Sequence, residues 1–200
     1  MVLNTSQLDI LQELINIGIG RAAGGLNRMT RSHVVIRIPE LVTLDNARLR
    51  EIVAAWTQTL ADLVTLEFSG AFQGAAALVF SPESGSNLVR LLLGLAPDAE
   101  PATDMRSDTL REVGNILLIA VIGSLANVLK QHVEYKPLEH SQGRSPALAR
   151  NTKGAKIALL AKADLALEDR HVCGEVCILF PERGFASLVE ILNRLTRELG

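Results

Sequence analysis

Cysteine is nearly absent from this chain of 200 residues, since the only two, Cys173 and Cys177, stand in the stretch HVCGEVC. A single C-x3-C pair matches neither a zinc framework nor a disulfide scaffold. If the stretch is a strand, alternation places His171, Cys173, Glu175 and Cys177 on one face. Ligands on one straight strand are spread by about 6.6 Å per two residues, too far apart to surround an ion. We therefore expect two buried, reduced thiols and no metal site.

An excess of charge of either sign is also missing, because the formal net charge is only −2. Nucleic-acid-binding proteins usually carry a broad basic surface, so DNA and RNA are not expected as partners. The opening stretch, MVLNTSQLDI, has no basic segment followed by an apolar one. This argues against a secretion signal and favours a cytoplasmic location.

Long uninterrupted apolar runs are absent as well. The best candidate, residues 113–129, is interrupted by Asn115, Ser124 and Asn127, and so falls short of the ~18 apolar residues that a membrane helix needs. We expect a buried helix there and no membrane insertion. The hydrophobic share of 48% is nevertheless enough to build the core of one domain or of two small fused ones.

The chain does contain an internal repeat. DILQELINIGIG begins at Asp9, and DTLREVGNILLI, with the same Asp, Glu and Asn spacing, begins 99 residues later at Asp108. GAAALVF at residues 74–80 likewise resembles GEVCILF at residues 174–180. We infer a single domain, residues 1–200, made of two fused repeats at about 6–94 and 105–198, with a linker at about 95–104.

The first repeat has the periodicity of a long helix, several strands and a closing helix. The long helix is expected over residues 6–29, capped by Thr5 or Ser6. Strands follow at HVVIRIP, LVTLEF and GAAALVF, and the amphipathic stretch ESGSNLVRLLLG closes the repeat. The span from Asp45 to Leu60 suits a helix but has no obvious counterpart in the second repeat. We interpret it as an insertion, with Trp56 in the core.

The second repeat predicts a helix over residues 107–130, a strand HVEYKP, a polar loop EHSQGRSPALARNTKG, strands in AKIALLAKADLAL and HVCGEVCILF, and a final helix GFASLVEILNRL. Strands joined by hairpins form antiparallel sheets. The pattern therefore predicts an α/β protein of the α+β type, internally duplicated about a pseudo-twofold axis. Its antiparallel sheet would be accompanied by two long motif-bearing helices and by closing helices.

A polar stripe marks each long helix, because positions i, i+4 and i+7 of a helix share one face. The stripes are Asp9, Glu13 and Asn16 in the first repeat, and Asp108, Glu112 and Asn115 in the second. Such a stripe can be no more than the solvated side of an amphipathic helix. Asn is harder to explain in this way, because it is a mediocre helix former whose side chain competes for backbone hydrogen bonds.

The repeated residues are a carboxylate and a neutral amide, and no Ser-His-Asp, Cys-His or metal-ligand set recurs with them. An amide is not a useful nucleophile or general base. It can, however, donate and accept hydrogen bonds at once, which suits the task of holding a water in line with a phosphorus atom. Gln has this task in GTPases, in a reaction where positioning and electrostatics supply nearly all the catalysis.

Glycines follow the first stripe in GIGRAAGG, residues 18–25. A dinucleotide-binding turn needs an apolar strand before its glycines, and none precedes these. We expect instead that Gly18, Gly20, Gly24 and Gly25 let another helix or the sheet approach closely.

The pattern Asp, three residues, Glu, two residues, Asn, continued as NIGIGRAAGGLNRM, resembles the CheC/CheX/FliY family of chemotaxis phosphatases. The stretches FSPES and FPERG, which enter the closing helices, and the two-copy layout resemble CheC in particular. The second motif departs from the first after its Asn, reading NILLIAV where the first reads NIGIGRA. Packing around the second helix is therefore expected to differ.

The resemblance implies hydrolysis of the aspartyl phosphate on the response regulator CheY. Asn16 and Asn115 would orient the attacking water, and Glu13 and Glu112 would anchor the active-site lysine of the regulator. The supporting residues, with a role in helix capping or partner contact, would be Asp9 and Asp108. The resemblance implies no cofactor of the chain's own, because the magnesium would belong to the regulator.

An alternative remains open beside the phosphatase. A protein of this family can also be a weakly active binding module that engages phosphorylated CheY, the deamidase CheD, or both. The intact Glu and Asn in both repeats favour the enzyme, since a pure scaffold has no need of either pair. Fused repeats often replace a dimer, so a monomer is expected.

Overall fold

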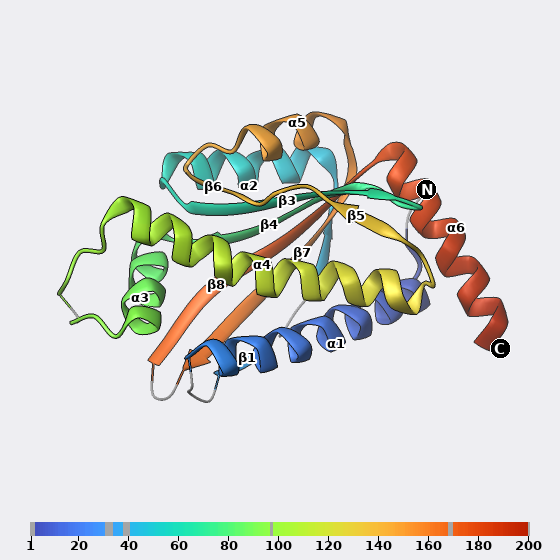
Figure 1. Cartoon of the computed structure of the whole chain (residues 1–200). Coiled ribbons are helices and arrows are strands. Elements are labelled where there is room, and N and C mark those ends of the chain that lie inside the picture. Colours follow the sequence, from blue (N-terminus) through green and yellow to red (C-terminus); the bar gives the residue numbers. More distant parts are fainter. Residues whose placement is uncertain (1–2, 31–33, 38–40, 97, 168–169, 200) are drawn as a thin grey trace.

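The computed structural model describes residues 3–30, 34–37, 41–96, 98–167 and 170–199 (Figure 1). Its first half consists of α1 (Thr5–Thr30), β1 (Val34–Arg37), β2 (Leu41–Leu44), α2 (Asn46–Gln58), β3 (Asp62–Gly70), β4 (Gly74–Phe80) and α3 (Pro82–Leu93). Its second half has the same order: α4 (Thr103–Val128), β5 (Val133–Tyr135), β6 (Glu139–Gln142), α5 (Pro146–Gly154), β7 (Ala155–Leu167), β8 (Arg170–Pro181) and α6 (Glu182–Leu199). The long helices, the closing helices and most strands lie where the sequence predicted them. Of the strand predicted at HVVIRIP, residues 33, 38 and 39 lie outside the described residues.

The eight described strands form one sheet in the order β1-β7-β8-β4-β3-β5, with β2 also paired to β7 and β6 to β3. Every pairing is antiparallel, which confirms the prediction. β4 and β8 form the centre, where Ala77 lies opposite Cys177. Each half adds its first two strands to the hairpin of the other half, so the strand order is symmetric about this centre. The arrangement fits a pseudo-twofold axis, and duplication in the history of the chain stays a prediction.

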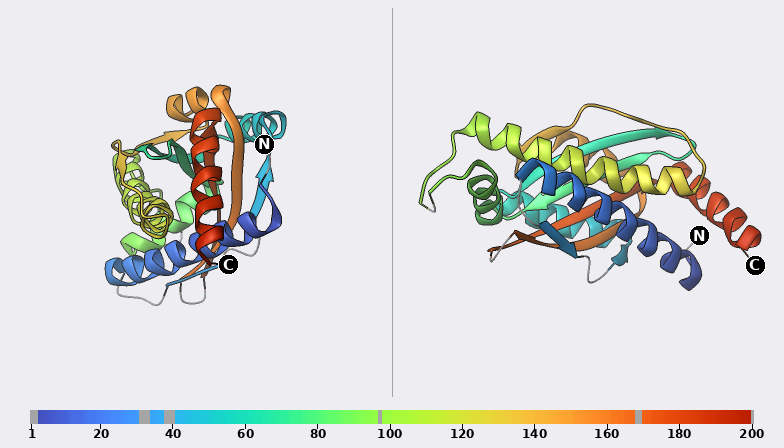
Figure 2. Two further views of the ribbon diagram at one scale, coloured as in Figure 1. Left: turned by 90° about the vertical axis from the view of Figure 1, so that its right-hand side faces the viewer. Right: turned by 60° about the horizontal axis from the view of Figure 1, so that its bottom comes forward.

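Helices cover both faces of the sheet (Figures 1 and 2). On one face, α1, α3, α4 and α6 bury the larger core cluster, which includes Leu66 and Phe180. On the other face, α2 and α5 bury a smaller cluster around Leu49. Trp56 belongs to this second cluster, as predicted, and its indole Nε1 donates to Glu175 Oε2 at 2.9 Å.

Two predictions for the region of α2 and α5 were wrong. The span from Asp45 to Leu60 is not an insertion, because α5 follows β6 as α2 follows β2. The stretch predicted as a polar loop therefore holds a strand and a helix. Ser145 caps α5 by accepting from Leu148 N at 3.1 Å. Pro146 opens the helix at a position where its missing N–H has no helical partner to lose.

The cap of α1 also differs from the prediction. Asn4, not Thr5 or Ser6, caps the helix, since its Oδ1 accepts from Gln7 N at 2.9 Å. The Oε1 of Gln7 accepts from Asn4 N at 2.9 Å, which completes a capping box. Gln7 is itself buried, and its Nε2 donates to Asn193 Oδ1 of α6 at 2.9 Å. The start of α1 is thus held by neutral amide groups.

α4 is long and apolar enough to cross a membrane by length and composition, but 61% of that stretch is buried inside the protein. It packs against α1 and against β3, β4 and β6 of the sheet, with Leu117 and Val121 at 1% and 0% exposure. The prediction of a buried helix is confirmed.

α1 and α4 pack side by side and run antiparallel, through close contacts at glycines of α1 (Figures 1 and 2). A Cβ at Gly18 would lie 2.6 Å from Val121 Cα, and one at Gly25 would lie 2.8 Å from Ile116 Cγ2. The predicted close approach is confirmed at these positions. It was wrong for the two remaining glycines, Gly20 and Gly24. A Cβ at either of those would meet neither another helix nor the sheet.

Candidate functional site

The first motif, which we define as Asp9, Glu13 and Asn16, lies on the outer face of α1. All three side chains are exposed. Leu11 and Ile15, which lie between them in the sequence, are 0% and 1% exposed because they face the core. The helix therefore presents the motif to solvent and turns its apolar side to the sheet.

The second motif, Asp108, Glu112 and Asn115, occupies the corresponding face of α4. Asp108 and Glu112 are exposed, and Asn115 is half-buried. Arg111 lies beside this motif, with Nη2 2.5 Å from Asp108 Oδ1. The first motif has the neutral Gln12 at the corresponding position. The two stripes thus share their Glu and Asn but differ in the charge beside them.

The two motifs lie toward opposite ends of the helix pair. Each motif stands in the first half of its helix, and α1 and α4 run antiparallel. In Figure 1, α1 begins at the right-hand end of the pair and α4 at the left-hand end. A partner bound at one motif would therefore contact a different stretch of surface from a partner bound at the other.

The key side chains of both motifs are available to a second molecule. Glu13, Asn16, Glu112 and Asn115 make no hydrogen bond or ion pair with any residue in the described ranges. An exposed asparagine keeps one acceptor and two donor positions for water or a partner. The arrangement can therefore offer a carboxylate and an amide together, at two places.

The predicted capping role of Asp9 and Asp108 was wrong. Asn4 caps α1, and the N-cap position of α4, Ala102, has no side-chain hydrogen bond. Both Asp residues lie beyond the first helical turn. Contact with a partner is the supporting role that stays a prediction for them.

Sequence reasoning missed a buried polar cluster at the start of α4. The Asp62 side chain is 0% exposed and forms an ion pair with Arg106, which also donates to Pro82 O at 2.9 Å and to Ser86 Oγ. His140 Nε2 lies 3.0 Å from Asp62 Oδ1. Gln142 Nε2 also donates to Asp62 Oδ1, at 3.3 Å. We call Asp62 and the groups bonded to it and to Arg106 the α4 anchor.

The α4 anchor controls the charge of Asp62. Burial alone would raise the pKa of this carboxyl, but hydrogen bonds from His140 and Arg106 outweigh it and lower the pKa below its ordinary value. Asp62 is therefore ionised, and Arg106 balances its charge. The signal in the sequence was Asp62 at the start of a largely apolar strand, because burying a carboxylate is costly unless a cation is paired with it.

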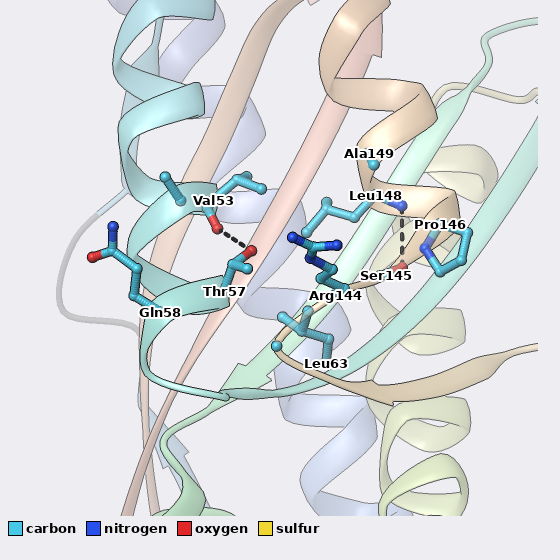
Figure 3. A pocket seen from close by; sticks show the side chains of 11 residues that line it. Val53, Thr57, Gln58, Leu63, Arg144, Ser145, Pro146, Leu148 and Ala149 are labelled. Carbon is cyan, nitrogen blue, oxygen red and sulfur yellow. Dashed lines mark hydrogen bonds between the residues drawn. The ribbon is translucent and has the colours of Figure 1, made fainter.

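A pocket of about 610 Å³ lies between α2 and α5 (Figure 3). Its walls include Val53 and Leu63, and its one charged lining residue among those described is Arg144. Thr57 Oγ1 donates to Val53 O at 3.0 Å, and Ser145 is the cap of α5, so both hydroxyls already serve their helices. The pocket is on the face of the sheet opposite the two motifs. It does not contribute to the candidate site.

The two cysteines differ in their surroundings. Cys177 is buried at the centre of the sheet, where desolvation and the nearby Glu175 raise the pKa of its thiol to about 12. Cys173 is exposed, so the prediction of two buried thiols was wrong for it. Within the described ranges, no group of three His, Cys, Asp or Glu side chains is placed to hold a metal.

No protein-family model matches the sequence, but the fold is similar to solved structures. FliY from Thermotoga maritima is 15% identical, with a TM-score of 0.71 over 97% of this chain and 99% of that chain. FliM from H. pylori, solved in complex with SpeE, is 12% identical, with a TM-score of 0.70 over 96% and 97%. CheX from Borrelia burgdorferi, solved with CheY, BeF3 and Mg2+, is 20% identical, with a TM-score of 0.56 over 84% and 97%.

At these identities the similarity concerns the fold, and the chemistry of the motifs has to be argued from this chain. The near-complete coverage of FliY and FliM means that the whole described chain, with both halves, takes part in the match. The chain has the fold of the CheC/CheX/FliY family.

Proposed function

We propose that this protein is a phosphatase that hydrolyses the aspartyl phosphate of the response regulator CheY. The observation that carries the proposal is the pair of outward-facing motifs, each with an unengaged Glu and Asn, on a fold shared with CheX and FliY. The same fold has been solved as a CheX–CheY complex, which supports CheY as the partner.

The amide of Asn16 or Asn115 supplies the chemistry by position. Bound beside the acyl phosphate, it accepts a hydrogen bond from a water and donates one toward the phosphoryl group, so the water is held in line with phosphorus. A bond from the water oxygen to phosphorus forms as the bond from phosphorus to the aspartyl oxygen breaks. The Asp carboxylate leaves with the electron pair, and inorganic phosphate takes the oxygen of the water.

The carboxylate of Glu13 or Glu112 serves to dock the regulator. It forms a salt bridge with the active-site lysine of CheY, one turn of helix away from the Asn that follows it. Asp9 and Asp108 extend the same stripe and would contact the partner further along. Magnesium would arrive with the regulator, whose phosphoryl oxygens it binds.

The second candidate function is a binding module with slight activity. Its support is that FliM, which has the same fold, has been solved in complexes with SpeE and with FliG. Such a module would engage phosphorylated CheY, CheD, or both. A cytoplasmic location and a monomeric state belong to the proposal in either form.

The test is the decay of phosphorylated CheY in the presence of Mg2+, measured with the wild type and with the double variant Asn16→Ala, Asn115→Ala. We expect the wild type to accelerate decay and the double variant to return it to the intrinsic rate of CheY. The matched control is Asn127→Ala, which removes another exposed asparagine of α4 outside both motifs. A wild type that binds phosphorylated CheY without accelerating its decay would replace the enzyme by the binding module.

A further inference from the structure

The two motif helices begin differently, although they occupy corresponding places in the two halves. Arg106 stands two residues before Asp108, and Gln7 stands two residues before Asp9. Arg106 reaches the buried Asp62, whereas Gln7 bonds the neutral side chain of Asn193. The ionic contact therefore exists at the start of α4 only, within the part of the chain that the structure describes.

The partner of the arginine is also specific to one half. Asp62 pairs with Phe80 at the end of the first hairpin, and its counterpart Ile157 pairs with Phe180 at the end of the second. Ile157 is buried and apolar and has no charge to offer. The α4 anchor thus has no equivalent beside α1.

The α4 anchor connects the start of α4 to several elements at once. Asp62 belongs to β3, Ser86 to α3 and His140 to β6. Gly85 fits against it closely, because a Cβ there would overlap the Asp62 carboxylate. Rotation or sliding of this end of α4 would break several charge-assisted hydrogen bonds together.

The anchored residue is close to the second motif along a rigid helix. Glu112 lies six residues after Arg106, and Asn115 lies nine residues after it. These separations correspond to about 9 Å and 14 Å of helix rise. Catalysis by a positioned amide is sensitive to small displacements, and a misplacement of about 1 Å can cost as much as about 100-fold in rate. Fixing Arg106 therefore restricts where the Asn115 amide can lie.

We propose that Asp62 and Arg106 are positioning residues for the second motif, and that they do not serve the first. The inference rests on the proposed phosphatase function. A purely structural role would make the same ion pair stabilise the whole fold, and its loss would then weaken both motifs alike. Selectivity for one motif separates the two roles.

The variant for this test is Asp62→Asn combined with Arg106→Gln, which removes both charges together and replaces the guanidinium by a shorter neutral amide. It is placed in Asn16→Ala, where the second motif works alone, and in Asn115→Ala, where the first works alone. In the first background we expect kcat toward phosphorylated CheY to fall roughly tenfold while KM stays within about twofold. In the second background both constants should stay within about twofold of the parent.

The control is Glu67→Gln, on the same strand as Asp62. Glu67 is also an ion-paired carboxylate, partly buried where Asp62 is fully buried, with Lys136 Nζ at 2.7 Å. It does not contact α4 through any hydrogen bond or ion pair described. Glu67→Gln should not change kcat in one background more than in the other. Equal loss of kcat in both backgrounds, or loss in neither, would overturn the positioning role.

Amide hydrogen exchange of the protein alone gives a readout that does not need catalysis. The neutral pair should speed exchange over residues 104–115 by at least about tenfold and leave residues 5–16 unchanged. Unchanged exchange over 104–115 would overturn the inference. A wild type without phosphatase activity would defeat the proposed function instead, and the exchange result would still decide whether the α4 anchor holds the second motif.

Discussion

α1 and α4 carry the same Asp, Glu and Asn stripe and lie side by side, yet they are held in place by different means. α1 starts with the neutral capping box of Asn4 and Gln7 and approaches its neighbour through Gly18 and Gly25. α4 starts with a buried ion pair and packs against α1 and against β3, β4 and β6 of the sheet. The part of each helix that faces a partner is alike, and the part that faces the protein is not.

This difference shows which features the proposed chemistry requires. In the proposed mechanism, Glu and Asn recur at the same spacing because docking and water positioning would need those groups on one face of a helix. The interior contacts are free to differ, provided that each helix is held firmly. The half-buried Asn115 and the exposed Asn16 are then two versions of one site in different surroundings.

The largest expected effect is the loss of stability when the ionic contact at the start of α4 is broken. Arg106→Ala leaves the buried Asp62 without its cation and should lower the free energy of unfolding by about 3–5 kcal/mol. Gln7→Ala removes two neutral hydrogen bonds at the corresponding position, with Asn4 N and with Asn193 Oδ1, and should cost about 1–2 kcal/mol. Urea unfolding of both variants measures the difference. Equal losses would mean that the two helix starts are held with equal strength.

A second effect concerns the glycines of α1. Gly18→Ala places a methyl group 2.6 Å from Val121 Cα, so overpacking should cost roughly 1–3 kcal/mol. Gly20→Ala is the matched control, since a Cβ there meets nothing within 4 Å. Its gain in helix propensity should stabilise the protein by roughly 0.5–1 kcal/mol. Thermal unfolding of the two variants should therefore shift in opposite directions, and a shift in the same direction would contradict this packing.

A third effect is the acid sensitivity of the α4 anchor, which Ile157 cannot reproduce in the other half. The pKa of Asp62 is lowered in the folded state, so its contribution to stability is present above the ordinary Asp pKa of about 3.9. It is lost as the pH falls further, through the folded-state pKa. Urea unfolding between pH 5 and about pH 2.5 should show a steeper loss for the wild type than for Asp62→Asn, Arg106→Gln. Parallel curves would show that Asp62 is not held ionised.

The smallest effect distinguishes Cys177 from the exposed Cys173. Burial and Glu175 raise the pKa of the Cys177 thiol to about 12, so at pH 8 it should not react with a disulfide reagent until the protein unfolds. Cys173 should react in the native state. Cys173→Ser therefore should abolish the native-state reaction, and a fast reaction that survives this substitution would show that the centre of the sheet opens.

Much of the fold was predictable because it depends on short-range sequence patterns. The helical period around Leu11 and Ile15 placed α1, and GAAALVF and GEVCILF placed the two central strands. The helix α5 was not predictable in this way, since Ser145 and Pro146 are typical both of loops and of the start of a helix. Its helical state depends on packing against α2, where Asn46 Nδ2 donates to Thr152 O at 2.8 Å.

The candidate site was predictable in part for a similar reason. The spacing of Glu13 and Asn16 depends only on helix geometry, so the sequence placed both on one exposed face. The α4 anchor joins Asp62 to residues far away in the sequence, Arg106 and His140, and such pairings are set by the sheet and not by local pattern. Roles assigned to the motif residues stay predictions until the chemistry is measured.

The most direct test compares the two motifs by the decay rate of phosphorylated CheY with Asn16→Ala and with Asn115→Ala. Because the motifs lie toward opposite ends of the helix pair, we expect them to act independently. Each single variant should keep part of the activity, and the two accelerations should sum to that of the wild type. Two results would contradict two independent Asn-based sites: loss of all activity in either single variant, or activity that survives in the double variant.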